Sequence, residues 1–407
     1  MKNIIFIFLF LVSFNLFAQK KLPNVDIIYS QSASTLHPKY TLFVSQKDSI
    51  SLYFKLNLKE FNFVVLDKHK LKAKIKIKYI FYNSLENTNI LDSASRVFSL
   101  TKNKINSSFV SYFEIPKPDS NSFLVIITED LYNNNKTLSF LEVDVSNSSS
   151  ERFMIMDAST HTPVFFDYVN NKKTYFVKTD LNIDSLKIQR FNYDTTMPLP
   201  PFSSFKKDFF IISDSIYNIG IDENFKFEKN YIYKISTLDG SVSKNIICFD
   251  NTYPYIIYSY QLLYPMKYLT TNEEFQNLKS YPNLKLAIDD FWLTISDNRE
   301  TVRNMLKIYY NRIQLSNYYF TEDKPGWMTD RGMIYTIFGP PVSLYKGDNF
   351  EEWLYFNPFS YKKESFYFAK KYDDLGIEKY ILKRNSLYLK YWRDAIDSWR
   401  KGVFYSF

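Results

Sequence analysis

The chain has 407 residues, a formal net charge of +8, 45% hydrophobic residues and 19% aromatic residues. A chain of this length is long enough for two or three domains with complete hydrophobic cores. Its one cysteine, Cys248, excludes an internal disulfide, so stability must come from packing.

The first residues have the pattern of a secretory signal peptide. Lys2 forms a short positive region, residues 4–17 form an apolar run too short for an ordinary membrane span, and Ala18 fits a cleavage site before Gln19. We therefore predict that residues 1–18 are a signal peptide and that the mature protein is exported to the periplasm or the outer membrane. No later segment is apolar enough to span a membrane as a helix. Export also argues against nucleic acid as a partner, although the net charge is positive.

Residues 19–148 alternate between apolar and polar positions as β-strands do. Apolar residues recur at every second position from Ile50 to Leu58, and lysines alternate with apolar residues over 70–79. Short strands joined by turn signals, without a clear helix, predict a β-sandwich-like domain. The row of lysines has two interpretations, a site for an anionic polymer or a solvated face that blocks edge-to-edge pairing, and we favour the second.

A second β-rich block follows the linker-like residues 147–150. Strand patterns continue as far as Phe249 and are interrupted by the proline-rich residues 197–201, since proline cannot donate to a sheet ladder. We predict a second β-sandwich-like domain over residues 149–252, with Cys248 buried in one of its strands.

After residue 250 the pattern becomes that of helices. Residues 271–274 and 297–300 have capping-box patterns, and apolar residues recur at helical spacing over 283–295 and 297–320. Further strands are predicted over residues 333–338, 352–357, 365–371 and 378–384, before a last helix that Ser386 caps. We therefore predict an α+β domain over residues 253–407, made of helices, an antiparallel sheet and a closing helix.

Three of the chain's 8 glycines fall in residues 324–341, which read KPGWMTDRGMIYTIFGPP. Their spacing fits neither a P-loop nor a dinucleotide-binding fingerprint, and Pro340 removes a backbone donor. We interpret the glycines as turn residues. In this interpretation Gly326 ends the loop after the long helix, Gly332 leads into a strand, and Gly339 ends that strand.

This stretch resembles the signature of the GWxTD-domain proteins, an exported bacterial family of Bacteroidetes and related phyla. The matching positions are Gly326, Trp327, Thr329, Asp330, Arg331, Gly332, Ile334, Tyr335, Gly339, Pro340 and Pro341, with Phe291, Trp292, Arg312, Asn317 and Phe320 upstream and Trp353 and Tyr355 downstream. The resemblance covers residues 285–385, about a quarter of the chain. It implies β-rich N-terminal modules, a C-terminal α+β domain and no known reaction. Residues 296–301 read SDNRET where the family tends to have an Asp-Pro-x-Pro-Gly-Thr turn, so an activity carried by that turn would be absent here.

The candidate binding residues belong to this signature, and we interpret them as mainly structural. They are Gly326, Trp327, Thr329, Asp330, Arg331, Gly332, Tyr335, Gly339, Pro340 and Trp353. In this interpretation Trp327 is buried in the core, while Asp330 caps a turn and pairs with Arg331 or another arginine.

Catalytic chemistry has little support in the sequence. His37, His69 and His161 all precede the C-terminal domain, which excludes triad catalysis there. No zinc, thiol-redox or hydrolase motif occurs, so we predict no catalytic residue, no metal and no cofactor.

One enzymatic alternative uses paired carboxylates acting on a sugar. The candidates are Asp330, residues 289–290 and residues 351–352, with Trp327 and Trp353 stacking on the sugar ring.

The sequence therefore supports two hypotheses. The first is a non-catalytic periplasmic or cell-surface protein that binds other envelope proteins, as an accessory subunit of an outer-membrane assembly or secretion complex. The second is a carbohydrate-active enzyme, or a protein that binds glycan or peptidoglycan.

Overall fold

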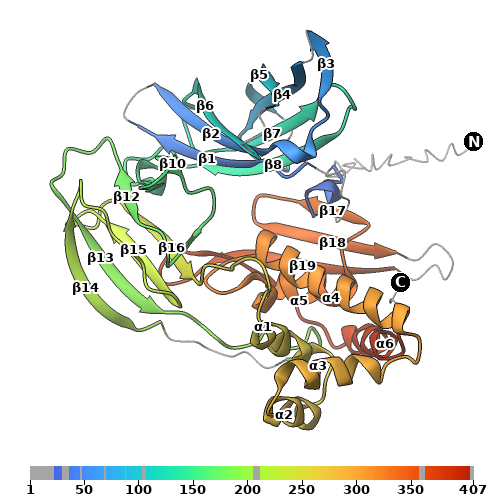
Figure 1. Ribbon diagram of the computed structural model, residues 1–407. Coiled ribbons are helices and arrows are strands. Elements are labelled where there is room, and N and C mark those ends of the chain that lie inside the picture. The colour runs from blue at the N-terminus through green and yellow to red at the C-terminus, as the bar shows by residue number, and fades with distance from the viewer. Residues whose placement is uncertain are drawn as a thin grey trace, which may run out of the picture.

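The computed structural model describes residues 23–29, 36–45, 48–67, 70–87, 89–102, 107–204, 211–356 and 363–403, so the predicted signal peptide lies outside it. Figure 1 shows two blocks of β-sheet, at the top and the left, and a third block of helices around a smaller sheet. The predicted fold class, β-sandwich-like domains followed by an α+β domain, is confirmed. The domain boundaries near residues 148 and 252 stay a prediction. None of the described helices is long and apolar enough to cross a membrane.

The first block is a sandwich of two antiparallel sheets. One sheet contains β1 (Lys39–Val44), β2 (Ser49–Asn57) and β6 (Ser108–Pro116), and the other contains β3 (Val64–Asp67), β4 (Lys70–Tyr82), β5 (Ile90–Thr101), β7 (Ser122–Asp130) and β8 (Lys136–Val143). A short 3-10 turn, η2 (Leu58–Glu60), follows β2. Alternate residues of β2, such as Leu52 and Phe54, share one core with Ile75 and Ile77 of β4, and all four are 0% exposed. The period of two read from the sequence therefore places the apolar face correctly.

The lysine row lies on a central strand, so its predicted role at a sheet edge is wrong. β4 pairs with β5 on one side and with β7 on the other, and Lys76 stands opposite both Val97 and Glu129. Alternation predicts which face a residue occupies, but it carries no information on whether its strand lies at the edge.

The second block also has two sheets. One contains β9 (Met154–Asp157), β10 (Thr162–Pro163) and β12 (Tyr175–Lys178), and the other runs in the order β11 (Tyr168–Asn170), β16 (Ser243–Phe249), β15 (Tyr231–Ser236), β13 (Ser185–Asn192) and β14 (Ser213–Gly220). The 3-10 turn η3 (Ser150–Arg152) leads into this block. Cys248 is fully buried in β16, as predicted, and burial raises the pKa of its thiol to about 12. This thiol therefore stays protonated at neutral pH.

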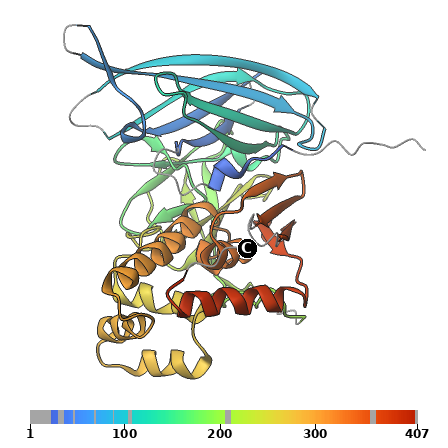
Figure 2. The ribbon, with the colours of Figure 1, turned by 90° about the vertical axis from the view of Figure 1, so that its right-hand side faces the viewer.

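The third block packs helices against a four-stranded antiparallel sheet (Figure 2). Its helices are α1 (Ser259–Leu263), α2 (Asn272–Ser280), α3 (Leu284–Leu293), α4 (Arg299–Tyr319), α5 (Asp330–Phe338) and α6 (Tyr388–Arg400), with 3-10 turns η4 (Tyr264–Tyr268) and η5 (Gly326–Met328). The sheet contains β17 (Ser343–Lys346), β18 (Phe350–Phe356), β19 (Lys363–Tyr372) and β20 (Glu378–Leu382).

Helix caps agree with the sequence in part. Thr271 and Glu274 form the predicted capping box of α2. The second pattern is offset by one residue, because Asn298, rather than Asp297, accepts hydrogen bonds from the first backbone N–H groups of α4. The predicted cap of the last helix at Ser386 is also wrong, since α6 begins after Leu387.

The strand predicted over residues 333–338 is wrong, because these residues form most of α5. Isoleucine, tyrosine, threonine and phenylalanine favour strands on exposed or half-buried surfaces. Here all nine residues of α5 are buried, so packing on every side decides the conformation. A helix without a polar face has no amphipathic period from which it could be recognised.

The N-terminal end of the described chain completes the core of the third block. The backbone N–H of Val25 donates to Leu344 of β17 at 2.9 Å, and Asn24 accepts from the N–H of Leu344 at 2.8 Å. The 3-10 turn η1 (Asp26–Tyr29) then places Tyr29 in the core, 7% exposed. Figure 1 shows this turn beside β17. The α+β block is therefore closed by residues more than 200 positions away from it in the sequence.

Candidate functional site

Two glycines of the signature allow backbones to touch. A Cβ atom on Gly326 would lie 1.9 Å from the carbonyl oxygen of Ser316 in α4, and one on Gly332 would lie 1.8 Å from the carbonyl oxygen of Gly326. No side chain can occupy such positions, so the requirement is close approach rather than an unusual φ. α4, η5 and α5 are thus held in direct backbone contact.

Gly339 serves a different purpose. It ends α5 with a φ of 84°, a left-handed conformation that glycine adopts without strain. Pro340 follows and cannot continue the helix. The predicted role of this pair in ending an element is right, although the element is a helix and not a strand.

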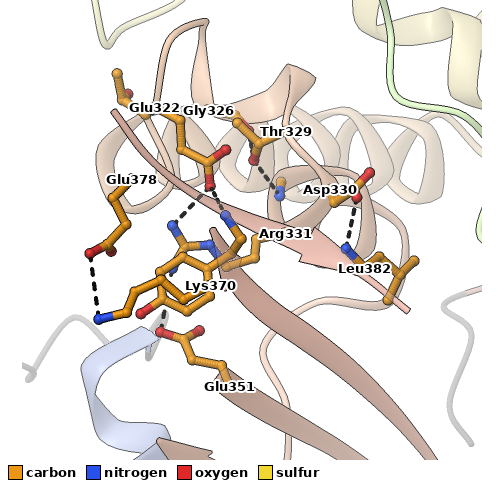
Figure 3. Close-up of polar contacts among 12 residues, drawn as sticks. Glu322, Gly326, Thr329, Asp330, Arg331, Glu351, Lys370, Glu378 and Leu382 are labelled. Carbon is orange, nitrogen blue, oxygen red and sulfur yellow. Dashed lines mark hydrogen bonds and ion pairs between the residues drawn. The ribbon is translucent and has the colours of Figure 1, made fainter. Parts of the chain in front are cut away.

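Thr329 starts α5. Its hydroxyl accepts from the N–H of Gly332 at 3.1 Å and donates to the carbonyl of Gly326 at 2.8 Å (Figure 3). One hydroxyl therefore caps the helix and fixes the turn before it. The ring of the neighbouring Trp327 is only partly buried, against the interpretation that placed it in the core. It packs edge-on against Tyr268, with 6.0 Å between the ring centroids.

Asp330 connects α5 to the end of the sheet and to the second block. It accepts from the N–H of Leu382 at 2.8 Å and forms two bonds with the guanidinium of Arg384, at 3.0 and 2.6 Å. Arg384 also donates to the carbonyl of Leu199, at 3.0 Å, in the proline-rich segment. The arginine partner is therefore Arg384 and not Arg331, and the predicted turn cap is provided by Thr329 instead.

Asp330→Asn should lower the free energy of unfolding by about 1–3 kcal/mol, since the change removes a charge-assisted pair while leaving the side chain 8% exposed. All five tryptophans lie between residues 292 and 399, so their fluorescence during urea unfolding of the full chain reports on this block. The isosteric change at Asp289, a half-buried aspartate on α3, is the control and should have an effect below about 0.5 kcal/mol. An equal effect of both changes would contradict the assigned role.

Arg331 lies at the centre of a buried charge network. Its guanidinium donates to Glu322 at 3.1 Å and to Glu351 at 3.3 Å, and it stacks 3.8 Å from the centroid of the Tyr380 ring. Figure 3 shows the two glutamates on opposite sides of Arg331. The arginine is 7% exposed, and although burial lowers its pKa, the charge of Glu351 above all holds that pKa above the ordinary value. A buried cation of this kind needs such partners, because burial without them is costly.

Glu351 is 0% exposed and has the most partners in the network. Besides Arg331, it accepts from Lys346 at 2.9 Å, from the indole N–H of Trp353 at 3.0 Å and from the hydroxyl of Tyr29 at 3.0 Å. Burial alone would raise the pKa of this carboxyl, but Lys346 and Arg331 lower it to about 2. Glu351 is therefore ionised at neutral pH and joins the N-terminal turn, α5 and the sheet.

Glu322 behaves in the opposite way. It accepts from Arg331 and from the N–H of Tyr380 at 3.0 Å, yet burial raises its pKa from 4.5 to about 8. In the unfolded chain this carboxyl titrates at its ordinary, lower pKa. The native state therefore binds the proton more tightly, and the resulting stabilisation is present below pH 4.5 and is lost as the pH rises to about 8.

Replacing Glu322 should remove that pH dependence. The quantity to compare is the free energy of unfolding of the unchanged protein minus that of Glu322→Gln. We expect this difference to fall by more than about 1 kcal/mol as the pH rises from 5 to 8. Urea unfolding at closely spaced pH values measures the difference. A constant difference across this range would show that the buried carboxyl does not titrate there.

The enzymatic alternative is not supported by the geometry. Glu351 and Glu352 are adjacent in β18, so their side chains lie on opposite faces of the sheet and cannot act as a pair. Asp289 and Asp290 lie on α3, away from both cavities described below. Trp353 is 0% exposed and cannot stack on a ligand.

The remaining motif residues also lie in the core or at its border. Tyr335 is fully buried, and its hydroxyl donates to the carbonyl of Tyr29 at 2.9 Å.

The histidines do not belong to this site. His37 lies 3.4 Å from Glu60, far from the signature in the sequence, and His69 lies outside the described residues. Among the residues that the structure describes, no group of three potential ligands could hold a metal ion.

Two cavities border the signature. The larger, about 1310 Å³, lies between the proline-rich segment, η4 and α2, and Trp327 lines it. The smaller, about 390 Å³, lies where the three blocks meet and is lined by Glu322 and Arg331. Of the ten signature candidates, Trp327 lines the larger of these two cavities and Arg331 lines the smaller, and the other eight line neither.

Four residues of this site were not singled out from the sequence: Tyr29, Glu322, Lys346 and Arg384. Each is a common polar residue without a motif of its own. Their partners lie up to 322 positions away, as for Tyr29 and Glu351. Of the four, Glu322 alone could have been suspected from the sequence, because it lies just before the signature, in the loop that leads into it.

Comparisons with known proteins support the family assignment. A family model described as the GWxTD domain matches residues 230–401, so it begins within the last strands of the second block. No curated protein matches the chain. Among solved structures, trypsin-activated alpha-2-macroglobulin from Escherichia coli aligns with 53% of this chain and 16% of that chain, at 7% identity and a TM-score of 0.17. The chain thus spans a small part of that protein. The match to the family model shows that this chain contains a GWxTD domain, over residues 230–401.

Proposed function

We propose that this protein is a non-catalytic periplasmic or cell-surface protein that binds other envelope proteins, as an accessory subunit of an outer-membrane assembly or secretion complex. The observation that supports the non-catalytic role is that the charged side chains of the signature form ion pairs within the fold. Asp330 is paired with Arg384, and Arg331 is paired with two glutamates, so each joins segments of the fold. Asp330 also lines neither of the two cavities, whereas reactive groups in enzymes face a site that substrate can enter.

Two edge strands support a role in binding proteins. Among the described strands, β5 pairs only with β4, and β14 pairs only with β13. Both edges carry exposed apolar side chains: Val97 is 57% exposed on β5, and Ile216 is 60% exposed on β14. Unpaired strand edges of this kind accept a strand from another chain, and isolated proteins usually protect them with charges or prolines.

Purification of the tagged protein from its native membranes tests the proposal. A stoichiometric protein partner should be recovered with the unchanged chain and lost with Val97→Lys or Ile216→Lys, since a lysine on the edge opposes strand addition. Leu286→Lys is the matched control, because Leu286 is 55% exposed on a helix and not on a strand edge. Recovery of the partner with all three variants, or of no partner at all, would contradict the proposal.

A further inference from the structure

The larger cavity has the size and lining of a binding cleft for a chain-like ligand. Its volume of about 1310 Å³ exceeds the roughly 300–1,000 Å³ of small-molecule pockets. It is bordered by aromatic side chains from η4, the signature and α6, among them Tyr264, Tyr268, Trp327 and Trp392. Tyr264 is 48% exposed, so its side chain is accessible to a ligand. Such rings offer flat apolar surfaces beside polar hydroxyl groups.

The charge of the cleft is positive. Three lysines line it, Lys229, Lys267 and Lys279, and none forms an ion pair with a described residue. Asp250 is the one carboxylate among its described lining residues. That carboxylate already accepts from the N–H and the hydroxyl of Thr252, at 2.8 and 2.6 Å. Lys267 lies over the ring of Phe275, at 5.9 Å from its centroid. With three lysines and one carboxylate among its described lining residues, the cleft favours a ligand with negative charge.

Several polar side chains belong to residues that line the cleft. Asn230, Asn272 and Gln276 line it, and their side-chain amides make no hydrogen bond with the described part of the chain. Each amide offers a donor and an acceptor, which matches the hydroxyl groups of a sugar. The lining comes from loops, helices and the end of one strand, without a length of unpaired strand edge. An extended peptide would therefore lack the main-chain pairing that usually holds it.

We propose that this cleft binds an oligosaccharide whose sugars carry carboxylate groups. The exposed ring of Tyr264 and the partly buried rings of Trp327 and Trp392 contact the sugar faces, the amides bind hydroxyl groups, and the lysines bind the carboxylates. This inference is independent of the proposed protein partner, because β5 and β14 do not line the cleft. Loss of one function therefore leaves the other measurable.

Calorimetric titration of the full mature chain with hexagalacturonate tests the inference. Maltohexaose, a neutral hexasaccharide, and hexaglutamate, an acidic peptide, are titrated in parallel. We expect binding of hexagalacturonate that weakens as salt is raised, since exposed charges are screened. Binding of maltohexaose should be weaker by roughly tenfold or more, because it lacks partners for the lysines.

Matched variants locate the site. Tyr264→Ala and Lys267→Met should each weaken binding of hexagalacturonate by roughly tenfold. Tyr281→Ala and Lys285→Met are the controls, because these residues are similarly exposed and do not line the cleft, and they should leave affinity unchanged. Melting curves of all four variants show whether each is folded.

Three results would overturn the proposal. The first is absence of binding to hexagalacturonate by the folded protein. The second is binding of hexaglutamate or maltohexaose as tight as that of hexagalacturonate, which would assign the cleft to a peptide or a neutral glycan. The third is an equal loss of affinity in the cleft variants and the controls, which would place the ligand elsewhere.

Discussion

Gly332→Ala should lower the free energy of unfolding by about 3–5 kcal/mol, near the upper end for a single substitution. The added Cβ would lie 1.8 Å from the carbonyl oxygen of Gly326 and 2.9 Å from the Cα of Trp327, and both are backbone atoms. Backbone cannot rotate away as a side chain can, so α5 must move off η5. That movement would also break the hydroxyl contacts of Thr329.

Gly220→Ala is the matched control for this prediction. The new Cβ at Gly220 would approach only the flexible side chain of Glu223, at 3.3 Å. We expect a change below about 1 kcal/mol there. Urea unfolding followed by tryptophan fluorescence measures Gly332→Ala, and circular dichroism measures both variants. A small effect of Gly332→Ala would mean that η5 and α5 are not in the contact described.

Glu351→Gln should cost about 3–5 kcal/mol, because it leaves the buried Arg331 and the partly buried Lys346 without their shared anion. The cost should also depend on pH. Since the folded pKa of Glu351 is depressed to about 2, its stabilisation is present above pH 4.5 and is lost as the pH falls toward 2. The difference between the unchanged protein and the variant should shrink over that range.

Glu352→Gln provides a close control, since it changes the next residue of β18, which is half-buried on the opposite face. Its effect should be within about 0.5 kcal/mol. If the two variants were equally stable at pH 7, the charge network would not hold the N-terminal turn and the sheet together as described.

Local patterns predicted much of the fold. Period-two alternation identified β2 and β4 and their buried faces, and a capping box located the start of α2. Alternation could not place β4 at the centre of its sheet, because pairing partners come from distant parts of the chain. α5 was missed because its burial on all sides removes the helical period and its residue types favour strands.

The site was predictable only as a motif. Gly326, Gly332 and Thr329 act on neighbours within ten positions, and a structural role for them follows from local chemistry. The partners of the charged residues are distant: Asp330 meets Arg384, 54 positions on, and Glu351 meets Tyr29, 322 positions back. Contacts at such separations depend on the assembled fold, and a single sequence gives no local signal for them.

The central claim is that the charged residues of the signature join segments of the fold, and a double-mutant cycle on Asp330 and Arg384 tests it most directly. Unfolding free energies are measured for the unchanged chain, Asp330→Ala, Arg384→Ala and the double variant. The two side chains form a bidentate pair at 2.6 and 3.0 Å, so the coupling energy should be about 1.5–3 kcal/mol. A coupling energy near zero, with Asp330→Ala as stable as the unchanged protein but unable to recover its partner from membranes, would contradict the claim and identify Asp330 as a functional carboxylate.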